Sequence, residues 1–318
     1  MRRRQFLSFL GTAATFPLFA RAQPAMRRIG VLVLGNPDPE PFLKQLRDGL
    51  LTLGYVDGRD VQLEVRSAEG NARSLPDAAA DLVRLKVDVI VAWQTPAAMA
   101  AKSSTSEIPI VMTAADPVGT GLVGSVSRPG GNITGLDIFG AQLGAKCIEL
   151  VREAIPSARK VTILANATDP FTKALLAQIN MAAGSIGIAA QPLIRVPDDN
   201  FETAFTEMRN DGTDAVIIQP TLIGAAVIQL ALKQQLPSFS FVRGLPAAGG
   251  LMAYAINAAE QTDQLSGYVD RVLKGAKPAD MPIWQTTRFS LVINLKTARA
   301  LGLDIPPTLL ARADEVIE

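Results

Sequence analysis

The sequence predicts an α/β protein of two similar lobes, each a doubly wound parallel sheet, joined by a hinge. Short apolar stretches alternate with segments whose apolar residues recur every three to four positions, as buried strands and amphipathic helices do. This order of elements occurs twice along the chain. With 318 residues and 48% hydrophobic side chains, the chain is long enough for two domains with a core each.

The first half begins with an apolar strand at 29–34 and a helix at 41–53. Phe42, Leu46 and Leu50 form the apolar stripe of this helix, and Gly54 ends it. Further along, strands are expected at 61–65, 88–92 and 108–112, with helices at 75–85 and from 96 to 102. Strands this apolar indicate a sheet covered by helices on both faces.

The second half repeats the first. Strands are expected at 161–165, 188–196 and 214–218, with helices at 173–183 and 201–208. Local landmarks also match at a spacing of about 130 residues, which is typical of an internal repeat. The matching pairs are Gly54 with Gly187, Asp88 with Asp214, and Ile108 with Leu236.

The repeat predicts where a ligand would bind. In open parallel sheets, ligands bind beyond the carboxyl ends of the strands, so two facing sheets enclose a cleft that can close over a small molecule. We expect the chain to cross between lobes near 133–139 and 251–256. The N-terminal lobe would then comprise 27–136 plus 255–281, and the C-terminal lobe 137–254 plus 282–318.

The N-terminus has the pattern of an export signal. Three arginines at 2–4 precede an apolar run at 6–19, and Ala20-Arg21-Ala22 supplies a small-x-small cleavage site. The arginine pair followed by Phe6 and Leu7 resembles a twin-arginine signal. We therefore expect a signal peptide at 1–22, cleavage after Ala22 and a periplasmic protein. The alternative is an uncleaved anchor, although the run is shorter than the roughly 20 residues of a membrane span.

The composition argues against several classes of protein. Lys and Arg number 31 against 30 Asp and Glu, so there is no basic excess of the kind that nucleic-acid-binding proteins carry. The chain has no histidine and one cysteine, which excludes histidine-based catalysis and His- or Cys-rich zinc sites. We expect a binding protein with no catalytic residue, cofactor or metal, and Cys147 as a structural thiol.

Polar residues follow the expected strands of both halves, where a cleft would lie. In the first half, Thr95 would cap a helix and receive a carboxylate, and Asp116 would pair with an ammonium group. Aromatic rings near the same edges, at Trp93, Phe139 and Phe171, could stack on a ligand. The expected ligand-binding residues are Gly35, Asn36, Gln94, Thr95, Asp116, Asn166, Thr168, Asp169, Gln219, Thr221, Arg243 and Tyr254.

These residues also have purely structural interpretations. Thr95 and Asn166 could serve as helix caps without touching a ligand, and Asp116, which precedes Pro117, could serve only to start a turn. An arginine such as Arg243 could form a surface ion pair instead of a ligand contact. The segment Gly119–Gly124 also fits the G-x-G-x-x-G pattern of nicotinamide enzymes. It follows a fourth strand, and no acidic residue stands at the required distance, so the pattern alone is weak.

Several longer segments carry a family resemblance. They include 53–59 (LGYVDGR), 114–119 (AADPVG), 128–136 (RPGGNITGL), 248–252 (AGGLM), 273–280 (LKGAKPAD) and 293–298 (INLKTA). On these segments the chain resembles the ABC-transporter substrate-binding proteins that include the tryptophan/tyrosine-type binding proteins, with the type I periplasmic-binding fold. The resemblance covers essentially the whole chain after the signal.

The resemblance implies a periplasmic protein that captures a small solute in the cleft and delivers it to a membrane permease and its ATPase. The solute would be an amino acid, with aromatic amino acids among the candidates, and the protein would be a monomer. Two alternatives remain open at this point. One is an exported ligand sensor for a receptor kinase, and the other is a nicotinamide-dependent enzyme.

Overall fold

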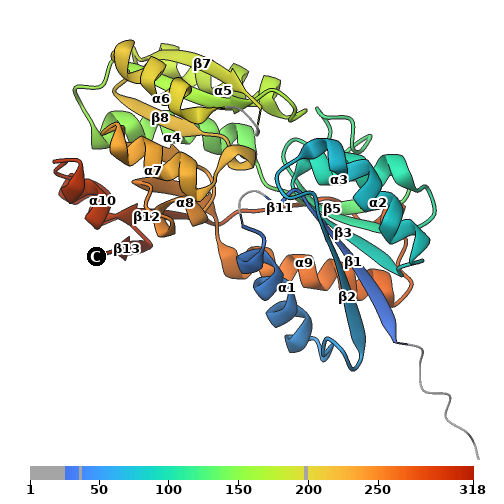
Figure 1. Ribbon diagram of the computed structural model, residues 1–318. Helices are drawn as coiled ribbons and strands as arrows, with labels where there is room; N and C mark the ends of the chain where they lie inside the picture. The colour runs from blue at the N-terminus through green and yellow to red at the C-terminus, as the bar shows by residue number, and fades with distance from the viewer. Residues whose placement is uncertain (1–25, 36–37, 197–199) are drawn as a thin grey trace, which may run out of the picture.

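The computed structural model describes residues 26–35, 38–196 and 200–318, and it shows two α/β lobes lying side by side (Figure 1). The expected signal peptide and Asn36 lie outside the described residues. Each lobe is built on one sheet, with strand order β11-β5-β4-β3-β1-β2 in the first and β13-β12-β10-β9-β8-β6-β7 in the second.

The first lobe contains the N-terminal half and a short return of the chain. Its strands are β1 (Arg27–Val33), β2 (Val61–Ser67), β3 (Val89–Trp93), β4 (Ile110–Ala114), β5 (Ile133–Asp137) and β11 (Trp284–Gln285). Its helices are α1 (Glu40–Thr52), η1 (Ala72–Ser74), α2 (Leu75–Arg84), α3 (Thr95–Ser104), α9 (Ala258–Leu273) and η3 (Pro278–Asp280).

The second lobe contains the rest. Its strands are β6 (Lys160–Asn166), β7 (Ala189–Arg195), β8 (Ala215–Ile218), β9 (Ser238–Ser240), β10 (Met252–Ile256), β12 (Phe289–Asn294) and β13 (Glu315–Ile317). Its helices are α4 (Gly140–Ala154), α5 (Thr172–Ser185), α6 (Phe201–Asn210), η2 (Pro220–Leu222), α7 (Ala225–Lys233), α8 (Gly244–Ala247), α10 (Leu295–Ala300) and α11 (Pro307–Leu310).

The two sheets share a five-stranded parallel core. The order β5-β4-β3-β1-β2 in the first corresponds strand by strand to β10-β9-β8-β6-β7 in the second. This confirms the prediction of two similar doubly wound lobes. The second sheet is extended beyond the repeat by β12, which pairs antiparallel with β10, and by β13.

Helices cover both faces of each sheet, which explains why the central strands are apolar throughout. In the first lobe α1 and α9 bury one face, and α2 with α3 bury the other. In the second lobe α4 and α5 cover one face, and α6 with α7 cover the other. The edge strand β7 has one partner, and four of its seven residues are exposed.

The chain crosses between the lobes at three places, each just beyond a strand. It leaves the first sheet after β5, returns after β10, and leaves again between β11 and β12. The helix after each of the first two crossings packs on the other lobe's sheet: α4 follows β5 but covers the second sheet, and α9 follows β10 but covers the first. The core of each lobe therefore includes a helix that directly follows a strand of the other lobe's sheet.

The expected boundaries need correction in detail. The segments proposed as hinges are largely strands, because 133–137 pairs with β4 and 252–256 pairs with β9 and β12. Residues 255–256 thus belong to the second sheet. Residues 284–285 belong to the first, since Trp284 pairs with Leu136. A two-residue strand without an apolar run gives no periodic signal, so the third crossing, which was expected between residues 281 and 282, lies a few residues later, between β11 and β12.

A close approach between β4 and β5 fixes the edge where β5 ends. Gly135 lies opposite Met112 in the register and has φ +137°, and a Cβ there would stand 2.1 Å from the Met112 carbonyl oxygen. Only glycine fits this backbone. The next register positions bring Asp137 opposite Ala114, at the carboxyl edge of the first sheet.

Candidate functional site

The carboxyl edge of the first sheet carries an unusual concentration of left-handed backbone. The residues just after β3, β4 and β5 include Gln94, Asp116 and Phe139, with φ of 76°, 46° and 47°. Non-glycine residues adopt this conformation at a cost, and such residues cluster at functional sites. Three at neighbouring strand ends mark this edge as a candidate binding surface.

Gln94 and Thr95 form the corner between β3 and α3. The helix begins at Thr95, so Gln94 is its N-cap, one residue earlier than expected. The Thr95 Oγ1 accepts a hydrogen bond from the Ala115 N–H at 3.1 Å, which joins this corner to the end of β4. Gln94 is 7% exposed, and its Oε1 is a buried side-chain atom without a hydrogen-bond partner among the described residues. An unpaired buried acceptor costs free energy and is a common feature of ligand sites.

Asp116 is held in a turn after β4. Its Oδ1 accepts from the Gly119 N–H at 3.0 Å, and its carbonyl oxygen accepts from the Thr120 hydroxyl at 2.8 Å. The turn-forming role that the sequence allowed is therefore present. A Cβ on Gly119 would lie 2.0 Å from the Asp116 Oδ2, so this glycine makes room for the carboxylate. The glycine-rich segment 119–124 lies in the loop before β5, and no helix follows it.

Asp137 belongs to the same edge, although the sequence did not single it out. It ends β5, is 7% exposed, and its Oδ1 accepts from the Phe139 N–H at 3.0 Å. Its Oδ2 accepts from the Gln285 Nε2 at 3.3 Å. Burial raises the pKa of Asp137, hydrogen bonds from Phe139, Gln285 and the Asp116 backbone lower it, and the Asp116 charge raises it. The available signal was its position two residues before Phe139, the N-cap of the next helix, α4.

The corresponding edge of the second lobe is a closed hydrogen-bond network. The Gln219 Oε1 accepts from the Asn166 N–H at 2.8 Å and from the Thr172 hydroxyl at 2.9 Å, and its Nε2 donates to the Asp169 Oδ2 at 2.9 Å. The Asn166 Nδ2 donates to the Thr221 Oγ1 at 3.0 Å. These side chains are at most 9% exposed. The network holds the strand ends together and leaves Gln219 with both amide atoms occupied.

Thr168 and Asp169 complete this corner. The Asn166 Oδ1 accepts from both the backbone N–H and the hydroxyl of Thr168 at 2.9 Å. Asp169 accepts from the Phe171 N–H at 3.0 Å, so it caps the approach to α5. Burial raises the pKa of Asp169, and hydrogen bonds from Phe171, Gln219 and Thr221 oppose that rise.

Three expected ligand residues have other surroundings. Arg243 stands at the start of α8, is 46% exposed in its side chain, and forms an ion pair with Glu315 of β13. Tyr254 lies within β10 and stacks on Phe289 with ring centroids 5.6 Å apart. Gly35 follows β1 with φ +89°, and a Cβ there would meet the Ser67 Oγ at 2.4 Å. Within the described residues, the partner of Arg243 is therefore Glu315 of the C-terminal strand rather than a member of the strand-end network.

The aromatic candidates divide into two kinds. Trp93 ends β3, is partly exposed, and stacks on Phe42 of α1 with centroids 4.8 Å apart and planes 2° from parallel. Phe139 is also partly exposed, at the first crossing. Phe171 is 2% exposed and meets Phe241 edge-on, as a core residue does. Trp93 and Phe139, like the partly exposed Tyr254, remain rings that a ligand could reach.

Five of the strand-end segments together carry only negative charge, whereas the segment after β9 holds Arg243. The residues at 93–95, 114–117, 137–139, 166–169 and 218–221 include three carboxylates and no lysine or arginine. The carboxylates are those of Asp116, Asp137 and Asp169. A ligand that brings a positive group would be favoured at such edges.

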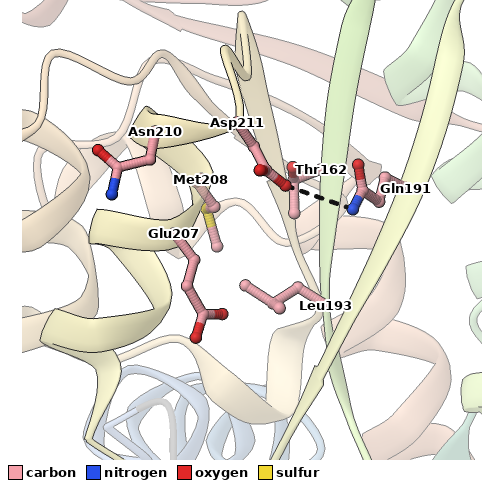
Figure 2. Close-up of a pocket in the computed structure, with 7 residues that line it drawn as sticks. All are labelled: Thr162, Gln191, Leu193, Glu207, Met208, Asn210 and Asp211. Carbon is pink, nitrogen blue, oxygen red and sulfur yellow. Dashed lines mark hydrogen bonds between the residues drawn. The ribbon is translucent and has the colours of Figure 1, made fainter.

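The described part of the chain also has two hollows away from these edges. One, of about 300 Å³, lies between α6 and the strands β6 and β7 and is lined by Thr162, Gln191, Leu193, Glu207, Met208, Asn210 and Asp211 (Figure 2). Thr162 lies near the start of β6, whereas Asn166 ends it. The other hollow lies between α1 and α9. Within the described ranges, no group of three or more Cys, Asp and Glu residues is placed to hold a metal ion.

Comparison with known proteins identifies the family. The sequence model of the ABC transporter substrate binding proteins matches residues 29–317. This chain belongs to that family. The resemblance found in its segments is therefore confirmed, and the two lobes have the predicted type I periplasmic-binding fold.

Individual relatives of this substrate-binding protein are similar over most of its length. A tyrosine-binding protein of Clostridioides difficile (strain R20291) is 27% identical over 269 residues, which cover 82% of this chain and 75% of that protein. A solved structure from Streptococcus pneumoniae, described as an ABC domain in complex with L-Trp, is 26% identical with a TM-score of 0.82 and covers 92% of this chain and 100% of that one. A conserved domain protein from Vibrio cholerae O1 biovar El Tor is 26% identical with a TM-score of 0.84 over 92% and 99% of the two chains.

The family assignment confirms that this is a substrate-binding component of ABC transport, related to tryptophan- and tyrosine-binding proteins. These relatives are transport proteins rather than enzymes, and they do not favour the sensor or the nicotinamide enzyme. Such proteins work with a small-molecule ligand and a membrane permease. In the part of this chain that the structure describes, no helix is both long and apolar enough to span a bilayer.

Proposed function

We propose that this protein is the periplasmic subunit of an ABC importer for an amino acid, with a preference for aromatic side chains. It binds the amino acid between the carboxyl edges of its two sheets and delivers it unchanged to the permease and ATPase. We also propose that the signal peptide is cleaved after Ala22 and that the mature protein is a monomer. The observation that carries the proposal is the likeness, over 92% of the chain, to a structure that holds L-Trp.

The first-lobe edge has groups suited to both ends of a zwitterion. Asp116 supplies a carboxylate for the ammonium group, and its Oδ2 is not used by the Gly119 turn contact. The N-terminus of α3 suits the carboxylate, because its first N–H groups and the helix dipole favour an anion. The Thr95 oxygen already accepts from Ala115, so its own hydroxyl proton remains to be donated to the ligand.

The aromatic preference follows from the rings at the same edge. Trp93 is fixed by its parallel stack on Phe42, so it presents a rigid and partly exposed surface. Offset stacking of a ligand ring on such a surface contributes about 0.5–1.5 kcal/mol beyond burial of area. The second lobe would then close over the ligand with a preformed edge, since the Asn166–Gln219–Asp169 network needs no ligand to be satisfied.

The test uses the mature chain, residues 23–318, in thermal-shift and calorimetric titrations with L-Trp, L-Tyr, L-Phe, L-Leu and indole-3-propionate. We expect the aromatic amino acids to raise the unfolding midpoint, because they bind only the folded state. Indole-3-propionate, which lacks the ammonium group, should bind at least ~10-fold more weakly than L-Trp. Mass spectrometry should recover the bound amino acid unchanged.

A pair of variants tests the site itself. Asp116→Asn keeps an acceptor for Gly119 but removes the charge, and it should weaken L-Trp binding by ~10-fold or more. Asp304→Asn, an exposed change in the second lobe, is the matched control and should leave the affinity within ~2-fold. The proposal is wrong if no amino acid binds, or if the ligand leaves chemically altered. Equal affinity of Asp116→Asn and the parent would reject the role of Asp116.

A further inference from the structure

The carboxylate of Asp137 lies at two of the strained corners of the ligand edge. It accepts from the Phe139 N–H at 3.0 Å, and it lies opposite Ala114 in the register, two residues before Asp116, whose backbone helps to lower its pKa. Both Phe139 and Asp116 have left-handed backbone, with φ of 47° and 46°. Such conformations persist only where the surroundings hold them in place. Asp137 holds the Phe139 corner directly and lies beside the Asp116 turn, which its own contacts with Gly119 and Thr120 also hold.

The same carboxylate reaches the third crossing between the lobes. Gln285 is the last residue of β11, lies opposite Asp137 in the register, and donates to its Oδ2 at 3.3 Å. The chain then passes through 286–288 into β12 of the second sheet. Since Phe139 stands at the first crossing, Asp137 joins two of the three connections between lobes to the turn that carries Asp116.

The third crossing is in turn tied to the second. The Thr286 hydroxyl donates to the Glu260 Oε2 at 2.9 Å, and the Asn257 N–H donates to the Arg288 carbonyl oxygen at 3.1 Å. Asn257 is the N-cap of α9 and Glu260 lies in its first turn, just after the crossing from β10. A displacement of one crossing therefore acts on the others through hydrogen bonds.

We propose that Asp137 is a positioning residue for ligand binding: it fixes the corners of Asp116 and Phe139 and couples them, through Gln285, to the crossings about which the lobes close. This inference rests on the proposed function. It assigns to Asp137 a role that is separate from contact with the ligand.

A plain structural role does not account for a carboxylate at this position. Asp137 is 7% exposed, and within the described residues its hydrogen-bond partners are neutral N–H groups, so its charge is desolvated without a cation beside it. The attachment of β5 to the returning chain is already made by Thr134, whose hydroxyl donates to the Met281 carbonyl oxygen at 2.7 Å. What Asp137 adds is a pair of carboxylate oxygens that accept hydrogen bonds from Phe139 and Gln285 beside the end of β4.

Four variants of the mature chain separate positioning from stability. Asp137→Ala removes both carboxylate acceptors. Asp137→Asn keeps one acceptor for the Phe139 N–H, and the Gln285 amide can rotate so that its oxygen accepts from the new Nδ2. Gln285→Ala removes only the hydrogen bond to β11. Thr134→Val is the matched control, since it removes a buried tie between the same two segments without touching the edge. Each variant is measured for amide hydrogen exchange at 116 and 139, for L-Trp affinity, and for lobe closure by small-angle scattering.

We expect Asp137→Ala to speed exchange at both amides and to weaken L-Trp binding at least ~10-fold, with Asp137→Asn restoring affinity to within ~3-fold of the parent. Gln285→Ala should leave the exchange at 116 unchanged but reduce the ligand-induced compaction. Thr134→Val should lower the unfolding midpoint and leave the affinity within ~2-fold.

Two results would overturn the inference. One is parent-like exchange and affinity in Asp137→Ala; the other is an equal loss of affinity in Thr134→Val, which would make the effect one of general stability. If the parent protein binds no amino acid, the proposed function fails by itself. Amide exchange in Asp137→Ala against Thr134→Val then still decides whether Asp137 holds the two corners.

Discussion

The buried amide of Gln219 offers a sharp test of how the second-lobe edge is held together. Gln219 is fully buried, its Oε1 accepts from the Asn166 N–H and the Thr172 hydroxyl, and its Nε2 donates to Asp169. Gln219→Leu replaces it with an apolar side chain of similar volume, so packing changes little. The hydrogen bonds, by contrast, are lost completely.

The expected cost follows from what each partner retains. The Asn166 N–H is left buried and unpaired, at about 1–3 kcal/mol, and Asp169 loses a hydrogen bond to a charged group, at about 1.5–3 kcal/mol. Thr172 keeps the Asn166 carbonyl oxygen as an acceptor, so it adds little. The free energy of unfolding should therefore fall by about 3–5 kcal/mol, a large part of a typical domain's stability.

Urea denaturation followed by circular dichroism measures this change, and Gln191→Leu serves as the matched control. Gln191 is exposed on the edge strand β7, so its replacement should shift the free energy of unfolding by no more than ~0.5 kcal/mol. A loss below ~1 kcal/mol in Gln219→Leu would contradict the view that this network stabilises the strand ends. In that case Gln219 would again be a candidate for direct ligand contact.

Two further predictions concern charged residues. Arg243→Ala should leave L-Trp affinity unchanged by calorimetry and cost at most ~1 kcal/mol of stability, because its ion pair with Glu315 is largely exposed; a marked loss of affinity would return Arg243 to the ligand site. Asp137→Asn should be more stable relative to the parent at neutral pH than at acid pH. The pKa of Asp137 is raised in the folded state, so the parent carries a penalty for ionisation above that pKa, and the penalty disappears as pH falls toward the ordinary value of 3.8. Thermal unfolding of both proteins between pH 3 and 8 measures this difference, and a constant gap across that range would refute the sign.

The candidate site shows where reasoning from sequence stops. Asn166 and Gln219 were placed correctly at strand ends, yet no local pattern distinguishes a ligand contact from a closed internal network, since both use the same side chains. The difference lies in contacts across about 50 residues of chain, such as that between Gln219 and Asp169. The ion pair of Arg243 could not be predicted for a similar reason, because its partner Glu315 is far away in sequence.

The order of strands and helices, the duplication and the parallel sheets were determined by the sequence alone. Those features arise from local periodicity and from runs of apolar residues, which each stretch of chain carries within itself. Only the tertiary structure decided that α4 and α9 complete each other's lobe, that β11 returns to the first sheet, and that Asp137 meets Gln285. Such pairings depend on which segments, distant in sequence, become neighbours in the fold. Burial then requires that a polar side chain, which forms no recognisable sequence motif, finds hydrogen-bond partners for its polar atoms.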